Sequence, residues 1–215
     1  MHLKRESAPK KWAIERKGTT YVVRPTGNLK LGIPLLIVLR DFLGIVKNRK
    51  EAKIAISSKK ILINLKKPKD EKQSLLLFDV LFIVPEKKFF RLTLNEKGKF
   101  SLEEINENES HLKISKIINK KILKGGRTQI NLLDGRNFIY NKKVNVNDSV
   151  LLNLKDKKIE KILPLKEGAN AFVFDGKHAG KKGRINSIDL KNKVVNLDFN
   201  GNSLKVLIKQ ILIIE

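Results

Sequence analysis

The spacing of hydrophobic residues predicts a helical region early in the chain. Leu35, Leu39, Phe42 and Val46 recur at intervals of three or four residues, which is the spacing of one helix face. Pro34 precedes them, and proline is favoured at the first position of a helix because its missing N–H would have no partner there. We therefore expect a helix that begins at Pro34 and runs towards Val46.

A second, shorter helix is predicted over residues 49–57, with Asn48 as its N-terminal cap. Its two faces differ in character. The residues expected to face inward are Ala52, Ala55 and Ile56. The residues expected to face outward are Arg49, Lys50 and Lys53. A polar turn then leads into a strand over residues 59–64, so this part of the chain predicts a helix–helix–strand module.

The remainder of the chain predicts strands, because short apolar runs alternate with turn residues. The run over 75–84 ends at Pro85 and is expected to form one buried strand, and 89–94 with 99–105 is expected to form a hairpin. Further strands are expected over 112–123, 128–133, 137–140, 150–154, 159–163, 171–174, 183–188, 194–199, 203–207 and 211–214. This regular series favours small barrels. The fold class expected is α+β, predominantly β.

The first thirty residues follow neither pattern. They contain many cations and few apolar residues, apart from Trp12 and the run 21–23. Such a segment has little surface to bury, so we expect a basic tail that becomes ordered on its partner.

Charge then narrows the functional classes. The chain has 46 Lys and Arg residues against 22 Asp and Glu residues, which gives a formal net charge of +24. An excess of this size calls for a polyanionic partner, because self-repulsion opposes the compact state. Most of the cations are lysines, which suit phosphate contacts better than the bidentate reading of bases. Nucleic acid bound through its backbone is the leading hypothesis, and acidic lipid is the weaker one.

Other classes find little support in the sequence. No apolar run approaches the roughly 18–20 residues of a membrane span, and the N-terminus lacks the apolar stretch of a signal peptide. Cysteine is absent, and the three histidines lie far apart, so neither a thiolate metal site nor a catalytic constellation is expected. We expect a soluble, cytoplasmic, non-enzymatic protein without a cofactor or metal.

One glycine-rich segment, residues 176–183, superficially resembles a phosphate-binding P-loop. Its glycine spacing is one residue short of that motif, and no Ser or Thr follows the lysines. It is better interpreted as the turn of a small barrel, where glycine permits positive φ. The turn is either an RNA-facing loop or a solvated hairpin tip.

Three segments, taken in order, resemble a known family. The first contains His2-Leu3-Lys4-Arg5, Ala8-Pro9-Lys10 and Trp12. The second contains Pro34-Leu35-Leu36, Leu39-Arg40-Asp41, Arg49-Lys50-Glu51-Ala52 and Lys60-Ile61-Leu62-Ile63-Asn64, and it is similar to an RNA-binding module found in bacterial small-subunit ribosomal protein four. The third, from Gly168-Ala169-Asn170-Ala171 to Gly183-Arg184-Ile185, resembles a KOW motif. Together they resemble the archaeal and eukaryotic-cytoplasmic, e-type family of small-subunit ribosomal protein four, in a short archaeal-like form.

The resemblance implies four regions: a basic tail over 1–33, the helix–helix–strand module over 34–92, a central β domain over 93–166, and a KOW-type SH3-like barrel over 167–215. It implies a structural protein that binds small-subunit ribosomal RNA and neighbouring ribosomal proteins, with no membrane, small-molecule substrate or homo-oligomer expected. The RNA-binding candidates are Lys4, Arg5, Lys10, Lys11, Trp12, Arg24, Arg40, Arg49, Lys50, Lys53, Lys59, Lys60, Lys177, His178, Lys181, Lys182 and Arg184.

Some alternatives remain open on the sequence alone. Trp12 either stacks on an unpaired base or anchors the tail against the folded protein, and Arg40 either contacts RNA or pairs with Asp41 or Glu51. At the level of function, the alternatives are a KOW-type transcription factor and an RNA-modifying or aminoacylating enzyme that carries the same module. The chain leaves no room for a catalytic domain beside its β regions, which disfavours the enzyme.

Overall fold

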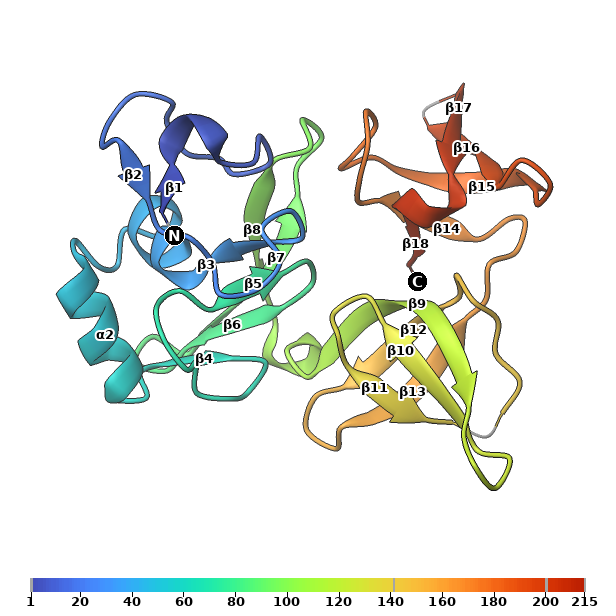
Figure 1. The fold of residues 1–215 in the computed structure, drawn as a ribbon, viewed down its shortest axis with the longest axis horizontal. Coiled ribbons are helices and arrows are strands. Elements are labelled where there is room, and N and C mark those ends of the chain that lie inside the picture. Colours follow the sequence, from blue (N-terminus) through green and yellow to red (C-terminus); the bar gives the residue numbers. More distant parts are fainter. Residues whose placement is uncertain (1, 141, 200, 215) are drawn as a thin grey trace. The chain divides into compact units, whose positions relative to one another are not determined.

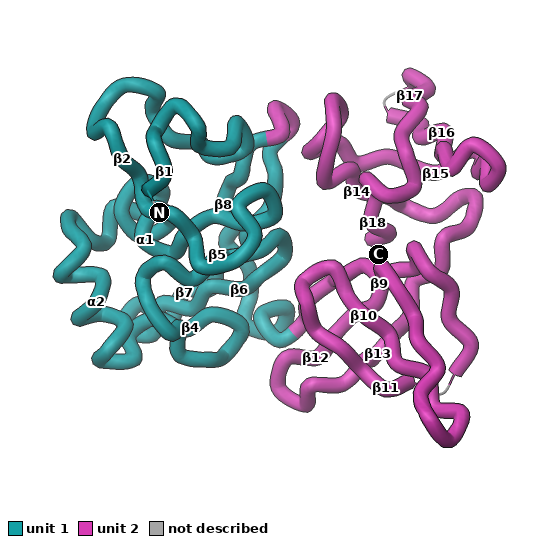
Figure 2. The backbone as a smooth tube through the Cα atoms, viewed as in Figure 1, with its two compact units in different colours: residues 1–95, 99–111 teal, residues 96–98, 112–215 magenta. Residues whose placement is uncertain are grey.

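The computed structural model describes residues 2–140, 142–199 and 201–214. The chain divides into two compact units (Figure 2): unit 1 comprises residues 1–95 and 99–111, and unit 2 comprises residues 96–98 and 112–215. Strands predominate in both units and helices are few and short (Figure 1), which confirms the predicted predominance of β-structure. The four predicted regions are a finer division, and their boundaries stay a prediction.

The N-terminal segment is folded onto unit 1. Strand β1 (Leu3–Lys4) pairs antiparallel with β2 (Tyr21–Val22), and a single 3-10 turn, η1 (Arg5–Ser7), follows β1. Trp12 holds the intervening loop, since its ring is 2% exposed and its Nε1–H donates to the carbonyl of Gly32 at 3.0 Å. The expectation of a tail that is ordered only by its partner is therefore wrong for this structure, because one aromatic anchor supplies the burial that the composition lacks.

The first helical region is shorter than predicted. It consists of α1 (Leu35–Ile37) continued by a π-helical turn, η2 (Val38–Phe42), and it ends where Gly44 adopts a φ of +66°. Val46 is buried, as its spacing suggested, but it lies outside the helix. Pro34 is the N-cap and belongs to β3 (Gly32–Pro34), so the predicted start was one residue early.

Helix α2 (Arg49–Ser57) is confirmed together with its cap. The Asn48 side chain accepts a hydrogen bond from the backbone N–H of Glu51 at 3.0 Å, and the Glu51 carboxylate accepts one from the backbone N–H of Lys47 at 2.7 Å. The Asn48 side chain also donates to the Glu51 carboxylate at 2.8 Å, so the two side chains form a variant of the capping box in which Glu51 reaches the N–H of Lys47 instead of that of the cap residue. Ala52 and Ile56 are buried, so the opposite face of the helix is left to solvent.

A four-stranded antiparallel sheet follows α2, in the order β4-β6-β7-β8. Its members are β4 (Ile61–Ile63), β6 (Val80–Ile83), β7 (Lys88–Leu94) and β8 (Phe100–Ile105), with the 3-10 turn η3 (Glu107–Glu109) after β8. The predicted β7–β8 hairpin is confirmed.

The single strand predicted over 75–84 is in fact two strands. Residues Ser74–Leu76 form β5, which pairs with β3, and the chain turns before β6 at Phe78, whose φ is +61°. The buried carboxylate of Asp79 stabilises this turn, because it accepts hydrogen bonds at 2.7 Å from the backbone N–H of Leu76 and from the Asn64 side chain. Hydrogen bonds from side chains hold this turn, and they do not change the pattern of apolar residues. The sequence therefore gave no indication that the apolar run contains a turn.

Unit 2 contains two five-stranded antiparallel sheets, and the predicted strands are present in both. The first sheet has the order β11-β10-β9-β12-β13, and its strands are β9 (Leu112–Ile122), β10 (Thr128–Leu132), β11 (Asn137–Ile139), β12 (Ser149–Asn153) and β13 (Lys158–Leu163). Its core is formed by Ile117, Ile130, Leu132, Val144, Val150 and Leu152.

The second sheet has the order β17-β16-β15-β14-β18. Its strands are β14 (Asn170–Val173), β15 (Lys182–Asp189), β16 (Val194–Phe199), β17 (Asn202–Leu207) and β18 (Ile211–Ile213), with the 3-10 turn η4 (Ile208–Gln210) before β18. Ten buried apolar residues, among them Ala171, Ile185, Val195 and Ile211, form its core.

Gly183 in β15 is required by the close approach of β16. A Cβ atom at this position would lie 2.3 Å from the backbone carbonyl oxygen of Asp198, a distance that only a shift of the strands can relieve. We expect Gly183→Ala to destabilise this sheet by about 1–3 kcal/mol, the usual cost of overpacking. Hydrogen exchange of the β14–β16 amides measures the loss, with Ser203→Ala at an exposed position of β17 as the control. Equal protection in the two variants would contradict the expectation.

Candidate nucleic-acid interface

The solvent face of α2 and the turn after it carry four exposed lysines. Lys50 and Lys53 are exposed on the helix, whereas Ala52 and Ile56 are buried, and Lys59 and Lys60 lie on the turn that leads to β4. The backbone N–H groups of Lys59 and Lys60 donate to Ile56 and Ala55, so the turn continues directly from the last helical residues. The capped helix and its bonded turn therefore hold these four side chains on one short, defined segment.

Arg49 belongs to the same helix, but its guanidinium has an internal partner. Its Nε donates to the Glu71 carboxylate at 2.6 Å, and Nη2 contacts the same oxygen. The Glu71 side chain is 3% exposed. Burial opposes its ionisation, but a backbone hydrogen bond, the hydrogen bond and charge of Arg49 and the charge of Lys53 outweigh this and hold the pKa of Glu71 below its usual value. Arg49 therefore has a structural role that its place in the sequence did not reveal.

Arg40 follows one of the two alternatives left open. Its guanidinium donates to both carboxylate oxygens of Asp41, from Nε and from Nη2, each at 2.9 Å. These hydrogen bonds raise the pKa of Arg40, against the opposing effect of burial. The pairing with Asp41 uses the fork that a phosphate would otherwise take.

Some of the N-terminal candidates have exposed side chains, and others have side chains that are hydrogen-bonded within the protein. Lys4, Lys10 and Arg24 are exposed, and Lys11 is partly buried. The Arg5 guanidinium donates to the carbonyls of Thr19 and Glu15 and to the Thr19 hydroxyl, at 2.7 to 2.9 Å, so it closes the loop between β1 and β2.

Trp12 is the other N-terminal candidate that the structure places inside. Its ring is buried and its N–H is bonded, which is the anchoring alternative and leaves no face for an unpaired base. The tail therefore presents lysines and Arg24 to solvent, while Arg5 and Trp12 keep it folded.

The turn between β14 and β15 presents the C-terminal candidates. Lys177 and Lys182 are exposed, and His178 is partly buried. Lys181 lies 4.7 Å from the ring centroid of Phe199, which is a cation–π distance. Arg184 is exposed but donates from Nε to the carbonyl of Gly168 at 3.0 Å, so it also fixes the loop that enters β14.

One cationic element escaped the sequence analysis. The hairpin formed by β9 and β10 carries Lys121, Lys124 and Arg127, all exposed, around the turn at Gly125 and Gly126. The sequence does contain one sign of this surface, since no acidic residue occurs between Glu109 and Asp134. This uncompensated stretch marks the hairpin as a further cationic surface.

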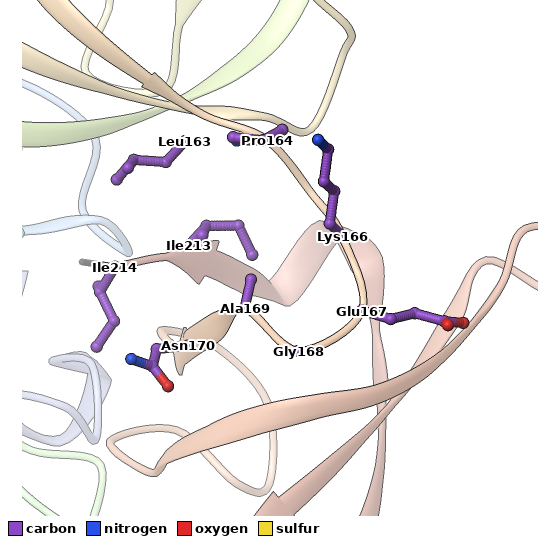
Figure 3. Close-up of a pocket in the computed structure, with 9 residues that line it drawn as sticks. All are labelled: Leu163, Pro164, Lys166, Glu167, Gly168, Ala169, Asn170, Ile213 and Ile214. Atoms are coloured by element: carbon purple, nitrogen blue, oxygen red, sulfur yellow. The ribbon is translucent and has the colours of Figure 1, made fainter.

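An open hollow of about 400 Å³ lies beside the loop that enters β14 (Figure 3). Its walls are largely apolar, with Leu163, Ala169 and Ile213 around it, while the polar ends of Lys166, Glu167 and Asn170 point in different directions (Figure 3). A small-molecule site needs several polar groups that converge on one ligand, and this arrangement lacks that convergence.

Residues 2–140, 142–199 and 201–214 contain no group of three or more His, Cys, Asp or Glu side chains that could hold a metal ion. Among the same residues, no helix has the length and hydrophobicity needed to cross a membrane.

Comparisons with known proteins point to one family. The model of the Ribosomal family S4e matches residues 86–159, and the model of the RS4NT (NUC023) domain matches residues 1–27. The small ribosomal subunit protein eS4 of Methanosphaera stadtmanae is 34% identical over 99% of this chain and 91% of its own length. The protein of the same name from Archaeoglobus fulgidus is 39% identical over 87% of this chain and 80% of its own length.

The fold is also found among solved structures. The crystal structure of the 30S ribosomal protein S4e from Thermoplasma acidophilum matches with a TM-score of 0.75 and 24% identity, over 86% of this chain and 95% of that one. This similarity shows the shared fold, and the nearly full-length relatives show the family. The chain belongs to the S4e family of ribosomal proteins.

Proposed function

We propose that this protein is a structural, non-enzymatic constituent of the small ribosomal subunit, where it binds ribosomal RNA and supports subunit assembly and translation in the cytoplasm. The observation that carries the proposal is the similarity over nearly the whole chain to archaeal proteins named small ribosomal subunit protein eS4. The net charge of +24 supplies the physical reason, since ribosomal RNA is a polyanion. The alternative of a KOW-type transcription factor has no comparable support.

The proposed mechanism is electrostatic. Exposed lysines contact RNA phosphates and release the counterions condensed on them, which favours binding at low salt. Helix α2 with its following turn is the part of the helix–helix–strand module, residues 34–92, that contacts RNA, and the sheet β14–β18 acts as a KOW-type barrel that presents Lys177 and Lys182. Neighbouring ribosomal proteins are the other partners that we infer, with no homo-oligomer and no small-molecule substrate.

The first test is sedimentation. A cell lysate is fractionated on a sucrose gradient at moderate salt and the fractions are probed for this chain. Co-sedimentation with small subunits that survives a high-salt wash supports the proposal. Recovery in the free pool or with RNA polymerase would overturn the ribosomal assignment, although the protein could still bind RNA.

The second test concerns the face of α2. Lys50→Ala with Lys53→Ala is expected to weaken binding to small-subunit ribosomal RNA and to lower the slope of log K against log salt by about 1–2, since two phosphate contacts are lost. Arg49 is left intact, because its removal would take both the hydrogen bond and the larger charge effect from the buried carboxylate of Glu71 and confuse binding with stability, whereas Lys53 contributes only the smaller charge effect.

Lys155→Ala with Lys158→Ala, which removes two exposed lysines around the β12–β13 turn, is the matched charge control. The α2 variant should lose more affinity and more slope than this control. Equal affinities and slopes in the two variants would exclude this face of α2 as an RNA contact.

A further inference from the structure

Three asparagines lie in line across three neighbouring strands of the first sheet of unit 2. Asn131 on β10 is the register partner of Asn119 on β9 and of Asn137 on β11. Two residues before Asn131 on β10, Gln129 is the register partner of Lys121 on β9 and of Ile139 on β11. Directly opposed residues point to the same side of a sheet, as do residues two apart in one strand. These six side chains therefore share one face, which we call the amide face.

The amide face is the side of these strands that faces solvent. The intervening residues Ile130 and Leu132 of β10 are 0% and 1% exposed and belong to the core beneath. Asn119, Lys121 and Asn137 are exposed, and Gln129 and Asn131 are partly exposed. Gln129 donates from Nε2 to the Asn131 side-chain oxygen at 2.9 Å, so two of the amides are already held in relation to one another.

The composition of the amide face differs from that of an ordinary solvated sheet face. It combines four carboxamides with one lysine, and its remaining residue, Ile139, is 56% exposed. Neither β9, β10 nor β11 contains an acidic residue. The strands β9 and β10 continue into the turn that carries exposed Lys124 and Arg127, so cations flank the amides.

This combination fits unpaired RNA better than it fits duplex RNA or an acidic protein. Carboxamides donate and accept hydrogen bonds at once, as base edges do, and unpaired bases expose those edges. Exposed apolar side chains such as Ile139 can contact a base face, and the lysines and Arg127 can contact the flanking phosphates. A duplex hides its base edges in a groove, and an acidic protein would need cations where this face has amides.

We propose that the amide face, with Lys121, Lys124 and Arg127 around it, binds an unpaired segment of RNA through its base edges. The proposal rests on the proposed function, and it adds to it a second surface that recognises bases as well as phosphates. Binding by the face of α2 is expected to be purely electrostatic, whereas binding here has a component that salt does not screen.

The experiment uses the full chain and two probes: a fluorescein-labelled, mixed-sequence 12-nucleotide single-stranded RNA and a 12-base-pair RNA duplex. Affinities are measured by fluorescence anisotropy over a series of salt concentrations. Asn119→Ala with Asn131→Ala and Asn137→Ala should weaken single-strand binding about tenfold or more with an unchanged salt slope, and should change duplex binding less than twofold. Lys121→Ala with Lys124→Ala and Arg127→Ala should lower the single-strand salt slope by about 2.

Two results with the asparagine variant would overturn the proposal. Wild-type affinity of the asparagine variant for the single strand excludes base contacts here, and an equal loss for both probes shows that the face is not specific for unpaired RNA. If the asparagine variant binds the single strand as the wild type does, and the wild type binds RNA, only the proposal for the amide face fails and the proposed function stands. If the wild-type chain binds neither probe and does not sediment with small subunits, the proposed function fails as well.

Stability is checked in parallel by thermal unfolding. If the triple variant is destabilised, Asn137→Asp on the edge strand β11 replaces it, because one new negative charge on this face should repel the single strand without removing any contact inside the protein. Unchanged single-strand affinity of Asn137→Asp would overturn the proposal in the same way.

Discussion

Replacing Asp134 by alanine is expected to cost unit 2 about 3–5 kcal/mol of stability, because the change leaves an ammonium group buried without its counter-ion. Lys113 Nζ donates to Asp134 Oδ2 at 2.8 Å. The two side chains are 1% and 5% exposed, respectively, so solvent cannot take the place of the lost carboxylate. Asp134 also accepts a hydrogen bond from the backbone N–H of Arg136 at 3.1 Å, and the alanine variant loses that turn contact as well.

The Lys113–Asp134 pair also makes the stability of unit 2 depend on pH in the acidic range. Burial by itself would raise the pKa of Asp134, but the charge and hydrogen bond of Lys113, with contributions from Arg136, outweigh it and hold the pKa below the usual value. A carboxyl group whose pKa is lower in the folded state stabilises the fold above its unfolded pKa. This contribution is lost as the pH falls from about 4 through the lower, folded pKa, and Asp134→Ala should remove that part of the acid sensitivity.

The single tryptophan makes the measurement selective. Trp12 lies in unit 1, so its fluorescence reports the unfolding of that unit, while hydrogen exchange of the β9–β10 amides reports unit 2. We expect Asp134→Ala to weaken protection in β9–β10 and to leave the Trp12 transition unchanged. The double variant Lys113→Met with Asp134→Leu, which replaces the pair by apolar groups, should recover most of the loss. A loss of less than 1 kcal/mol in Asp134→Ala would contradict a dominant role for the pair.

The sequence identified those elements whose signals are local. Helix α2 was predictable because its cap, Asn48, and its inward residues lie within ten positions of one another. The strands of unit 2 were predictable because each is a short apolar run bounded by turn residues. The break between β5 and β6 was not, since it depends on a hydrogen bond between Asn64 and Asp79, which are 15 residues apart.

The sequence predicted which residues are cationic and lie near the surface, but not which of them have hydrogen-bond partners inside the protein. The exposed lysines of α2 and of the β14–β15 turn lie where their charge suggested. Arg49 also lies on its predicted face, but its partner Glu71 is 22 residues away in the sequence. No pattern near α2 predicts that these two residues pair. Trp12 is a similar case, because its acceptor, Gly32, is 20 residues further along the chain.

Strand β9 shows the limit of hydrophobic patterning most clearly. In residues 112–118, alternation places Leu112, Ile114 and Ile118 on the face expected to lie inward and Lys113 on the opposite face. The structure instead buries Lys113 and Lys116, each at 2% exposure, and leaves Ile118 at 48%. The lysines can be inside because each has a polar partner supplied by a distant segment, Asp134 for Lys113 and the chain near β18 for Lys116.

Lys116 carries the second large effect. Its Nζ donates to the backbone carbonyl oxygens of Ile208 and, at 2.9 Å, of Ile211, so it binds the segment between β17 and β18 to β9. Its register partner Ser149 on β12 accepts a hydrogen bond from the backbone N–H of Ile213 at 2.8 Å. The two side chains thereby join the two sheets of unit 2. Lys116→Met, which keeps most of the length of the side chain, should cost about 2–5 kcal/mol at pH 7 because two buried carbonyls lose their donor.

The pH dependence of this cost distinguishes a buried amine from ordinary packing. Desolvation lowers the pKa of Lys116 to about 8, from the ordinary 10.5. Between these values the unfolded chain binds more protons at this residue than the folded chain, so stability rises with pH over that window. Neutral Lys116 still has two N–H donors for its two carbonyls, so deprotonation does not remove the hydrogen bonds.

The difference in stability between wild type and Lys116→Met should therefore grow by about 2–3 kcal/mol from pH 7 to pH 10. A difference of about 2.5 in pKa at about 1.4 kcal/mol each gives about 3.5 kcal/mol over the whole titration, and pH 10 still lies below the unfolded pKa of 10.5. Hydrogen exchange of β12 and β18, corrected for the intrinsic rate at each pH, measures it. Ser149→Ala is the matched control, because it removes the neighbouring link between the sheets without removing a titratable group. A difference that stays constant with pH, or that changes equally in the Ser149 control, would contradict the assignment of this pH dependence to Lys116.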